Sequence, residues 1–382
     1  MRASPAGLAV HIRAFRGVVI DSGKAGLEAT MASVPTSLSR YRNRVRVAPA
    51  MQDDAGSRID YLDGWRAIAV GLVIAAHTLS VYGIKILGVG TVGVYLFFGI
   101  SGYIITRLLL LEQIKTGSID LTAFYVRRLA RIFPPLIVFL IAMMVVWPDR
   151  AIFGQAARAA AFTCNIGFGG GCVRLLEHTW SLAFEEQFYL FYPLLLAGIR
   201  RWWLLPLAAF WALPFILPVA YIGHGGYLRV VAIMLLGAGY AAFEAPLSDL
   251  VKRTPKTIVA AMPIILTCWA LFDQTPLKIL LGAIVPLAAM MTVFALPVAF
   301  PVVRRVLTWK VLTRIGLYSY TFYLWQQFFS YPWSWNRGVL PVVGIFAGLA
   351  LAALSYHTLE KVCRDRARRF SQRRRSPAAG AV

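Results

Sequence analysis

Charged side chains are scarce in this sequence. Only 15% of its 382 residues are Asp, Glu, Lys or Arg, whereas 59% are hydrophobic, and the mean hydropathy is +0.66. Soluble domains carry about 25% charged residues. This composition excludes an ordinary soluble protein and indicates a polytopic membrane protein.

Acidic residues are the scarcer of the two charge types. The chain has 17 Asp and Glu against 39 Lys and Arg, which gives a net charge of +22. Such an excess can indicate nucleic-acid binding. Here the basic clusters lie near the two ends of the chain and between apolar runs, where the positive-inside rule predicts them for a membrane protein. We therefore expect the lipid bilayer as a partner and no nucleic acid.

Apolar runs, by contrast, are abundant. Several are shorter than the ~20 residues that a membrane-spanning helix usually needs, which indicates tilted or buried helices. Ten runs are candidate spans: residues 64–84, 89–110, 132–147, 180–199, 202–221, 228–244, 257–272, 278–299, 315–331 and 339–357.

The number of spans decides the topology. An eleventh run, 151–169, is rich in alanine, contains Arg158 and is typical of an interfacial helix. With ten spans the basic clusters all fall on one side of the membrane, whereas an eleventh span would move the later clusters to the other side. We predict an all-α integral membrane protein, a polytopic bundle of about 10 transmembrane helices, with both termini cytoplasmic and residues 148–179 outside.

Three parts of the chain follow from this topology. Residues 1–57 form a basic N-terminal tail that we expect to be disordered, and a true start at Met31 or Met51 would explain it equally well. Residues 58–360 form the membrane domain, and residues 361–382 form a basic cytoplasmic C-terminal tail.

Cysteine is also rare, with four residues and no metal-binding spacing such as C-x2-C. This spacing says little by itself about redox state or metals, and we expect no metal site. Cys164 and Cys172 both fall in the predicted outer segment, where a disulfide is chemically allowed. The sequence leaves open whether that disulfide forms.

The first predicted helix carries two ionisable residues in LDGWRAIAVGLVIAAHT, residues 62–78. Eleven positions, about three helical turns, separate Arg66 from His77, so the two share a face ~16 Å apart along the axis. Ionisable groups inside a span usually face a bundle interior or a water-filled cavity, which makes His77 a candidate functional residue. The structural alternatives are a histidine bonded to a backbone carbonyl and a snorkelling arginine.

The same segment resembles the first-helix signature of the acyltransferase-3 family of integral membrane acyltransferases: Arg or Lys, ten residues, then His. Other family motifs are resembled in the expected order over roughly residues 58–360 by FFGISGYIIT (97–106), FYVRRLARIFPP (124–135), HTWSLAFEEQFYLFYP (178–193) and IGLYSYTFYLWQQFF (315–329). One departure is plain, because Gln326 stands where the family usually has His. Because this second histidine is missing, we expect His77 to be the catalytic histidine.

The resemblance implies transfer of an acyl group, commonly acetyl, from cytoplasmic acyl-CoA to a hydroxyl of an extracytoplasmic or lipid-linked glycan. It implies a multi-pass protein of the inner (plasma) membrane. Acetyl-CoA or another acyl-CoA would be a co-substrate, and we expect no permanently bound cofactor. The expected partners are therefore acyl-CoA, a glycan or glycolipid acceptor and the bilayer.

Three arginines are the expected donor-binding residues: Arg66, Arg128 and Arg131. Arg128 and Arg131 lie at i and i+3 on one face of a cytoplasmic helix, which we expect the Pro134/Pro135 pair to end or redirect. A guanidinium group can bind phosphate in a bidentate manner. An ordinary positive-inside cluster is the alternative interpretation.

Two glutamates follow HTWSLAF near the outer end of the fourth predicted span, at a depth similar to that of His77. A carboxylate there could fix the tautomer of the imidazole and stabilise the imidazolium, so we predict His77 and Glu185 as catalytic residues. The alternative for Glu186 is a structural hydrogen bond between helices. The alternative for Trp180 is anchoring at the membrane interface. Four residues are expected to bind substrate: Ser101, His178, Trp180 and Glu186. We interpret four others as core or interfacial residues: Tyr318, Tyr320, Tyr323 and Trp325.

Two other classes of protein remain open. A secondary transporter would also bury histidine and glutamate, but it should have inverted-repeat halves with broken helices, and no such symmetry is visible. A non-catalytic membrane scaffold would tolerate loss of His77.

Overall fold

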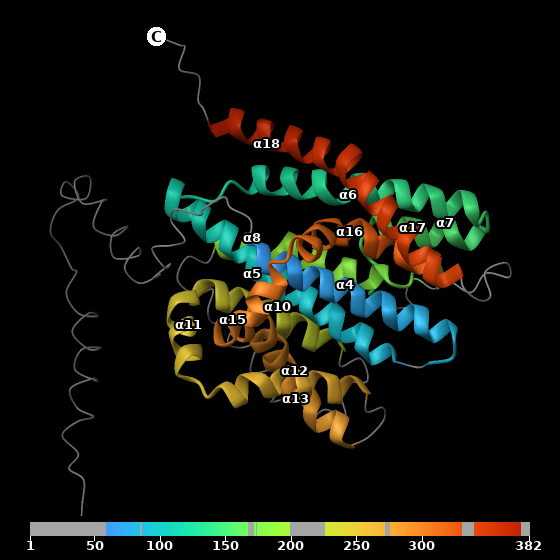
Figure 1. Ribbon diagram of the computed structural model, residues 1–382. Coiled ribbons are helices and arrows are strands. Elements are labelled where there is room, and N and C mark those ends of the chain that lie inside the picture. Colours follow the sequence, from blue (N-terminus) through green and yellow to red (C-terminus); the bar gives the residue numbers. More distant parts are fainter. Residues whose placement is uncertain are drawn as a thin grey trace, which may run out of the picture. The chain divides into compact units, whose positions relative to one another are not determined.

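The computed structural model describes residues 59–84, 86–166, 172, 174–198, 226–271, 276–330 and 340–375. All of them belong to a compact unit that spans Val47–Val382. The predicted N-terminal tail and the predicted span at 202–221 lie outside the described residues. Within those residues, every regular element is a helix (Figure 1).

In chain order the elements are α4 (Asp60–Val81), α5 (Leu87–Thr116), α6 (Leu121–Val146), α7 (Arg150–Ala160), the 3-10 turn η2 (Arg174–Leu176), α8 (Thr179–Gly198), α10 (Gly226–Ala242), α11 (Glu244–Arg253), α12 (Lys256–Leu271), α13 (Pro276–Met290), the π-helix η4 (Met291–Ala295), α14 (Leu296–Ala299), α15 (Pro301–Leu307), α16 (Lys310–Ser330), α17 (Leu340–Ser355), the π-helix η5 (Tyr356–Glu360) and α18 (Lys361–Arg375).

Among the described residues, four helical stretches are long and apolar enough to cross a membrane: α4, most of α5, α6 and residues 342–372. Two bent pairs raise this number to six if each counts as one span: 229–242 with α11, bent by 96°, and 284–299 with α15, bent by 107°. The prediction of an all-α membrane protein is confirmed. The ten spans and the cytoplasmic termini stay predictions.

Four helices form the centre of this unit. α4 packs between α5 and α16, and α5 packs in turn against α10. Two glycines allow the backbones to approach closely, because a Cβ on Gly102 would overlap the carbonyl of Met234, and one on Gly316 would overlap the carbonyl of Asp63. Small residues at helix contacts are typical of membrane bundles, where close packing replaces the hydrophobic effect between helices.

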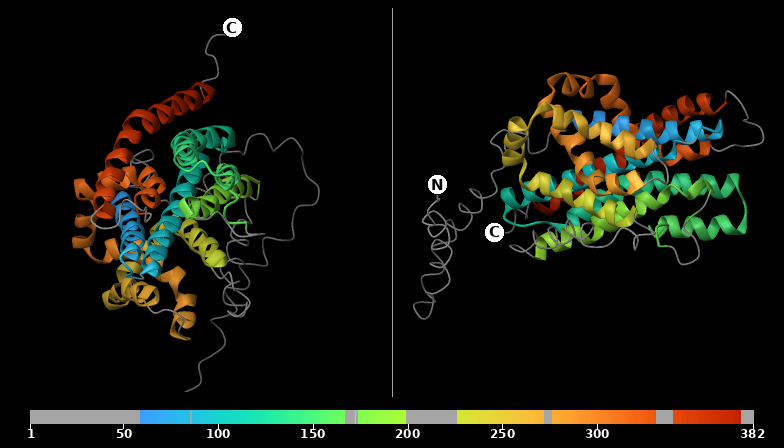
Figure 2. Two further views of the ribbon diagram at one scale, coloured as in Figure 1. Left: turned by 90° about the vertical axis from the view of Figure 1, so that its right-hand side faces the viewer. Right: turned by 90° about the horizontal axis from the view of Figure 1, so that it is seen from below.

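α4 and α16 run in the same direction. Gly316, near the start of α16, meets Asp63 near the start of α4, and Ser330 Oγ at the end of α16 lies 3.3 Å from Thr78 Oγ1 near the end of α4. α7 and α11 lie at opposite ends of the helical bundle (Figures 1 and 2). The parallel direction of α4 and α16 is the one expected if the first and ninth predicted spans enter the membrane from the same side.

α6 departs from the expectation for its prolines. We expected Pro134 and Pro135 to end or redirect a helix, but α6 continues through both over 26 residues. Proline removes a backbone N–H from the helix ladder, and neighbouring helices can satisfy the backbone groups of such a turn. In an uninterrupted helix the N–H groups at 134 and 135 would bond the carbonyls of Ala130 and Arg131. Tyr320 of α16 donates a hydrogen bond to the next carbonyl, that of Ile132, 2.9 Å away. The expectation of a helix end was therefore wrong.

The predicted outer segment contains α7, whose 11 residues are too few to span a bilayer. This helix buries Ile152, Ala156 and Ala159 and packs on α6 and α8. After it, Cys164 and Cys172 form a disulfide with a Cα–Cα distance of 5.0 Å. The sequence allowed this disulfide without requiring it.

The C-terminal basic segment begins as a helix. α17 continues through η5 into α18, which packs along α6 (Figure 1). Buried Glu360 lies in η5 and accepts a hydrogen bond of 2.5 Å from Thr321 of α16. The segment 361–375 is thus attached to the bundle by α6.

Candidate active site

Side chains from five helices line a small inner chamber of about 60 Å³. A buried site needs roughly 10–15 Å³ of this kind of volume for each water, so the chamber holds only a few waters or a group of similar size. Its polar lining comes from α4, α5, α6, α8 and α16: Arg66, Ser101, Arg131, Ser181, Glu185, Ser319, Tyr320 and Tyr323. The chamber therefore brings together four predicted site residues that lie far apart in the sequence: Arg66, Ser101, Arg131 and Glu185.

Glu185 is the only carboxylate among the described residues that line the chamber. Its Oε1 accepts hydrogen bonds from the hydroxyls of Ser101 and Tyr189. Arg66 forms an ion pair of 3.6 Å with Asp63, one turn earlier on α4. Ser101 is buried, and its hydroxyl is committed to Glu185.

Glu186, the neighbouring carboxylate, does not line the chamber. Its Oε1 is buried and has no hydrogen-bond partner within the described part of the chain. Arg128 and Arg131 lie close enough for their positive charges to attract this carboxylate.

His77 lies elsewhere on α4. Its Nδ1 is 2.9 Å from the carbonyl oxygen of Val73. A carbonyl can only accept, so Nδ1 carries the proton of the neutral imidazole, and Nε2 keeps the lone pair. The tautomer that we expected Glu185 to fix is thus set by the backbone of His77's own helix. His77 does not line the chamber. It lies eleven residues beyond Arg66, which does line it, and this is about 16 Å along the axis of α4.

His178 has the same arrangement of protons in the connection before α8. Gln327 Oε1 lies 3.2 Å from the backbone N–H of His178 and 2.7 Å from its Nδ1. The N–H can only donate, which identifies the amide oxygen and makes Nδ1 the second donor. Nε2 is buried without a partner among the described residues. Burial, opposed by the Gln327 hydrogen bond, lowers the pKa of His178 to about 4.

Trp180 packs into the core. Its ring meets Phe98 at 6.3 Å and Phe184 at 6.0 Å, both edge to face. Gln326, at the position where we expected the family's histidine, is 2% exposed, and its amide nitrogen and oxygen have no partner in the described structure. Stacking of Trp180 on a sugar stays a prediction.

Two site residues escaped the sequence interpretation. Tyr320 and Tyr323, which we interpreted as core or interfacial, both line the chamber. The hydroxyl of Tyr323 lies 2.6 Å from Ser181 Oγ and donates to the carbonyl of His178 at 3.1 Å. The available signal was their i, i+3 spacing, which places both on one helix face with Ser319.

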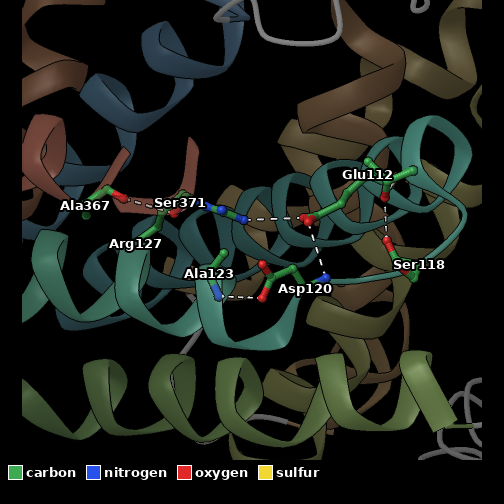
Figure 3. A network of polar contacts seen from close by, with 8 residues as sticks. Glu112, Ser118, Asp120, Ala123, Arg127, Ala367 and Ser371 are labelled. Atoms are coloured by element: carbon green, nitrogen blue, oxygen red, sulfur yellow. Dashed lines mark hydrogen bonds and ion pairs between the residues drawn. The ribbon is translucent and has the colours of Figure 1, made fainter. Parts of the chain in front are cut away.

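A second, larger cavity of about 560 Å³ adjoins the first. Its lining is strongly basic: Lys115, Arg127, Arg128, Arg131, Arg364 and Arg368. The carboxylate of Glu112 in this lining is held by Arg127 at 3.4 Å and by the backbone N–H of Asp120 at 3.3 Å (Figure 3). Asp120 itself caps the start of α6 by accepting from the N–H of Ala123.

Arg131 connects the two cavities, because it lines both. Arg128 lies beside this connection, with its guanidinium carbon 4.8 Å from the ring centre of Tyr189. The hydroxyl of that tyrosine donates to Glu185 in the inner chamber. Within the described residues, Arg128 and Arg131 form no ion pair. The predicted Arg128/Arg131 pair therefore lines a basic cavity that adjoins the chamber of Glu185.

Known proteins match most of this chain. It is 30% identical over 355 residues to the O-acetyltransferase OatA of Staphylococcus aureus, which covers 80% of this chain and 57% of the relative. It is 28% identical over 306 residues to the peptidoglycan O-acetyltransferase OatA of Listeria monocytogenes, with coverages of 69% and 48%. The chain spans about half the length of these curated relatives, and no solved structure matches it. Residues 59–357 match the acyltransferase domain, and this protein therefore belongs to the acyltransferase-3 family.

Proposed function

We propose that this protein is a membrane O-acyltransferase that moves an acyl group, in the first instance acetyl, from cytoplasmic acyl-CoA to a hydroxyl of an extracytoplasmic or lipid-linked glycan. The observation that carries the proposal is the pair of cavities joined at Arg131. A basic cavity of about 560 Å³ adjoins a small polar chamber of about 60 Å³, and Arg131 lines both. Coenzyme A has matching parts, a phosphate-rich end and a long thin arm that ends in a thioester.

The basic cavity is the proposed entrance for the donor. Its volume falls in the range of about 300–1,000 Å³ typical of small-molecule sites. Arg128 and Arg131 offer planar groups that can bind phosphate oxygens in pairs. The cavity lies at the end of the bundle where basic clusters predict the cytoplasm. Arg66 would meet the donor deeper, in the chamber that it shares with Arg131.

The inner chamber is too small for the whole arm of the donor, so donor binding must widen it. Glu185 accepts hydrogen bonds from Ser101, which lines the chamber, and from Tyr189. In this proposal it positions both hydroxyls and balances the charges of Arg66 and Arg131. This role differs from the direct partnership with His77 that we expected. The Nδ1 of His77, which we expected to bond Glu185, instead bonds the backbone carbonyl of Val73.

His77 is the proposed general base. With Nδ1 donating to Val73, its Nε2 can accept the proton of the acceptor hydroxyl. The hydroxyl oxygen then forms a bond to the acyl carbon, the carbon–sulfur bond breaks, and the proton passes to the coenzyme A thiolate. His178, with a similarly open Nε2, interacts electrostatically with His77 and marks the same outer region.

The acceptor and the membrane are proposed on separate grounds. The Listeria relative's name gives peptidoglycan as its acceptor, which supports a glycan of the cell envelope here. The disulfide between Cys164 and Cys172 suits an oxidising exterior. We place the protein in the inner (plasma) membrane, with the acceptor side at the disulfide, Trp180 and His178 near the acceptor, and Glu186 at the inner end of the acceptor site, toward Arg128 and Arg131.

The proposal is tested with the purified protein in proteoliposomes, supplied with acetyl-labelled acetyl-CoA and glycan fragments from the source cell envelope. We expect label on the glycan, and we expect an O-acyl group to disappear from surface glycans when the gene is deleted. Unchanged glycans together with no transfer would refute the function. Uptake of a solute without any acyl donor would instead favour a transporter.

A further inference from the structure

Helix α18 forms one wall of the basic cavity, although it lies outside the family match. The match ends at residue 357, whereas Arg364, Arg368, Ser371 and Gln372 of α18 line the cavity. We propose that α18 completes the donor site, with Arg364 and Arg368 binding phosphate groups of acyl-CoA opposite Arg128 and Arg131. This inference rests on the proposed function and deepens it, because it adds binding residues that the family motifs do not contain.

The side chain of Arg364 is held in place for such a role. One of its terminal nitrogens donates to the hydroxyl of Tyr356 at 2.8 Å, and its guanidinium carbon lies 5.1 Å from the centre of that ring. Its Nε is buried and has no hydrogen-bond partner among the described residues. A buried donor without a partner costs about 1–3 kcal/mol, so an acceptor from a ligand would relieve it.

The spacing of the α18 residues directs one face of the helix to the cavity. Arg364, Arg368 and Ser371 follow one another at i, i+4 and i+7, which is a single helical stripe. Arg368 is exposed at the rim of the cavity, one turn beyond Arg364. Arg366 and Arg369 belong to the same helix but are exposed and do not line the cavity.

The charge of the cavity favours a ligand with several phosphate groups. Six cationic side chains line it, and the carboxylate of Glu112 is already engaged with Arg127 and the N-cap of α6 (Figure 3). Arg364 and Arg368 form no ion pair within the part of the chain that the structure describes. Like charges gathered without counter-charges repel one another, and bound phosphates would remove that repulsion.

Phosphate could come from the donor or from a lipid headgroup of the inner leaflet. The position of Arg131 favours the donor as the source. Arg131 lines both this cavity and the inner chamber, through which the donor arm is proposed to extend toward His77. Binding of a lipid headgroup would not require a neighbouring polar chamber inside the bundle.

The test measures equilibrium binding of coenzyme A itself to the full chain in nanodiscs of zwitterionic lipid, which removes anionic headgroups. The variant R364Q/R368Q is compared with R366Q/R369Q, which loses the same charge from the same helix away from the cavity. We expect the Kd of R364Q/R368Q to rise by about 10- to 100-fold, the loss for one to two charge-assisted hydrogen bonds. The control should change by less than about threefold, as exposed charges do.

Each outcome decides the inference. Unchanged affinity in R364Q/R368Q would overturn it and assign α18 to lipid headgroups or to packing, while the proposed function would survive. Equal losses in both variants would also overturn it, because the effect would then be one of overall charge. If R364Q/R368Q is misfolded by size-exclusion chromatography, the single variant R368Q at the exposed rim is used, with R369Q as its control. Absence of coenzyme A binding by the wild type would refute the proposed function itself.

Discussion

At the scale of single residues, the helix that carries His77 leaves one of its ring nitrogens available for the proposed role as a base. The hydrogen bond from Nδ1 to the carbonyl of Val73 leaves Nε2 as the acceptor. Replacement by alanine removes the base and should lower the transfer rate by about 10² to 10⁴, the usual contribution of general-base catalysis. The measurement is acetyl transfer by purified H77A, alongside its binding of coenzyme A, which should stay within about threefold of wild type.

H357A is the matched control, since His357 is exposed and bonds only the hydroxyl of Tyr318 among the described residues. We expect nearly full transfer from this variant. Wild-type transfer by H77A, at equal protein in the membrane, would remove His77 from the mechanism and favour a scaffold or transporter.

His178 gives a prediction for pH. Its pKa falls from the ordinary 6.5 to about 4 because burial disfavours the charged ring, so the folded state binds fewer protons than the unfolded state between these values. Stability contributed by the neutral ring is complete above about pH 6.5 and is lost as the pH falls toward 4, by on the order of 3 kcal/mol.

The measurement for this prediction is thermal unfolding of the detergent-solubilised protein from pH 7.5 to pH 4.5. The melting temperature of wild type should fall more steeply than that of H178Q, which cannot titrate. Parallel curves for the two proteins would show that His178 is not the group that destabilises the fold in acid.

Some of these residues were predictable from the sequence, and others were not. Ser101, Arg131 and Glu185 stand in recognisable motifs, but their meeting in one chamber was not predicted, because the sequence placed Arg131 at the cytoplasmic side and Glu185 at the depth of His77. The partner of His77 was not predictable, because it is a backbone carbonyl, which every residue possesses. Tyr320 and Tyr323 looked like core residues because tyrosine is common both in cores and at membrane interfaces.

At the scale of helices, α6 begins earlier than the sequence predicted. Its first three turns carry Arg127, Arg128 and Arg131, so hydropathy placed the start of the span at residue 132, after the helix had already begun at Leu121. The polar start and the apolar remainder form one helix, and Tyr320 of α16 donates to the carbonyl of Ile132 just before the prolines. Periodicity within one segment contains no information about such a partner from a distant helix.

Close helix contacts give a paired prediction at this scale. Alanine at Gly102 would drive a methyl group into the backbone of α10, and overpacking of this kind costs about 1–3 kcal/mol. Alanine at Gly71, an exposed position of α4 with no atom within 4 Å of the new Cβ, should gain about 0.5–1 kcal/mol from the lower flexibility of the unfolded chain.

Thermal unfolding in one detergent compares the two glycine variants directly. The melting temperature of G102A should fall and that of G71A should rise or stay constant. Equal melting temperatures would mean that α5 and α10 do not approach as closely as the structure places them.

At the scale of the whole molecule, the prediction concerns the side of the membrane. A membrane-impermeant maleimide should label F153C on intact cells and W309C only after lysis, because residues 148–179 are predicted outside and residues 301–313 inside. Both positions are well exposed, at 53% for Phe153 and 62% for Trp309. Cys268 and Cys363, the free cysteines of the described residues, are first replaced by serine to remove background.

Two results of this labelling would contradict the topology. Labelling of W309C on intact cells would place α15 outside, and protection of F153C would remove the outward-facing acceptor region. Either result would separate the basic cavity from the cytoplasmic supply of donor that the proposed reaction needs.

The position of α18 has a practical consequence for recombining this protein with its relatives. A domain excised at the end of the family match, residue 357, would cut within η5, before Glu360 and before all four α18 residues that line the basic cavity. Chimeras joined at that boundary would exchange the inner chamber but inherit a foreign cavity wall. A junction placed after Arg375 keeps both cavities from one parent. For acyltransferase-3 chains built like this one, the unit of exchange is therefore longer than the unit of sequence similarity.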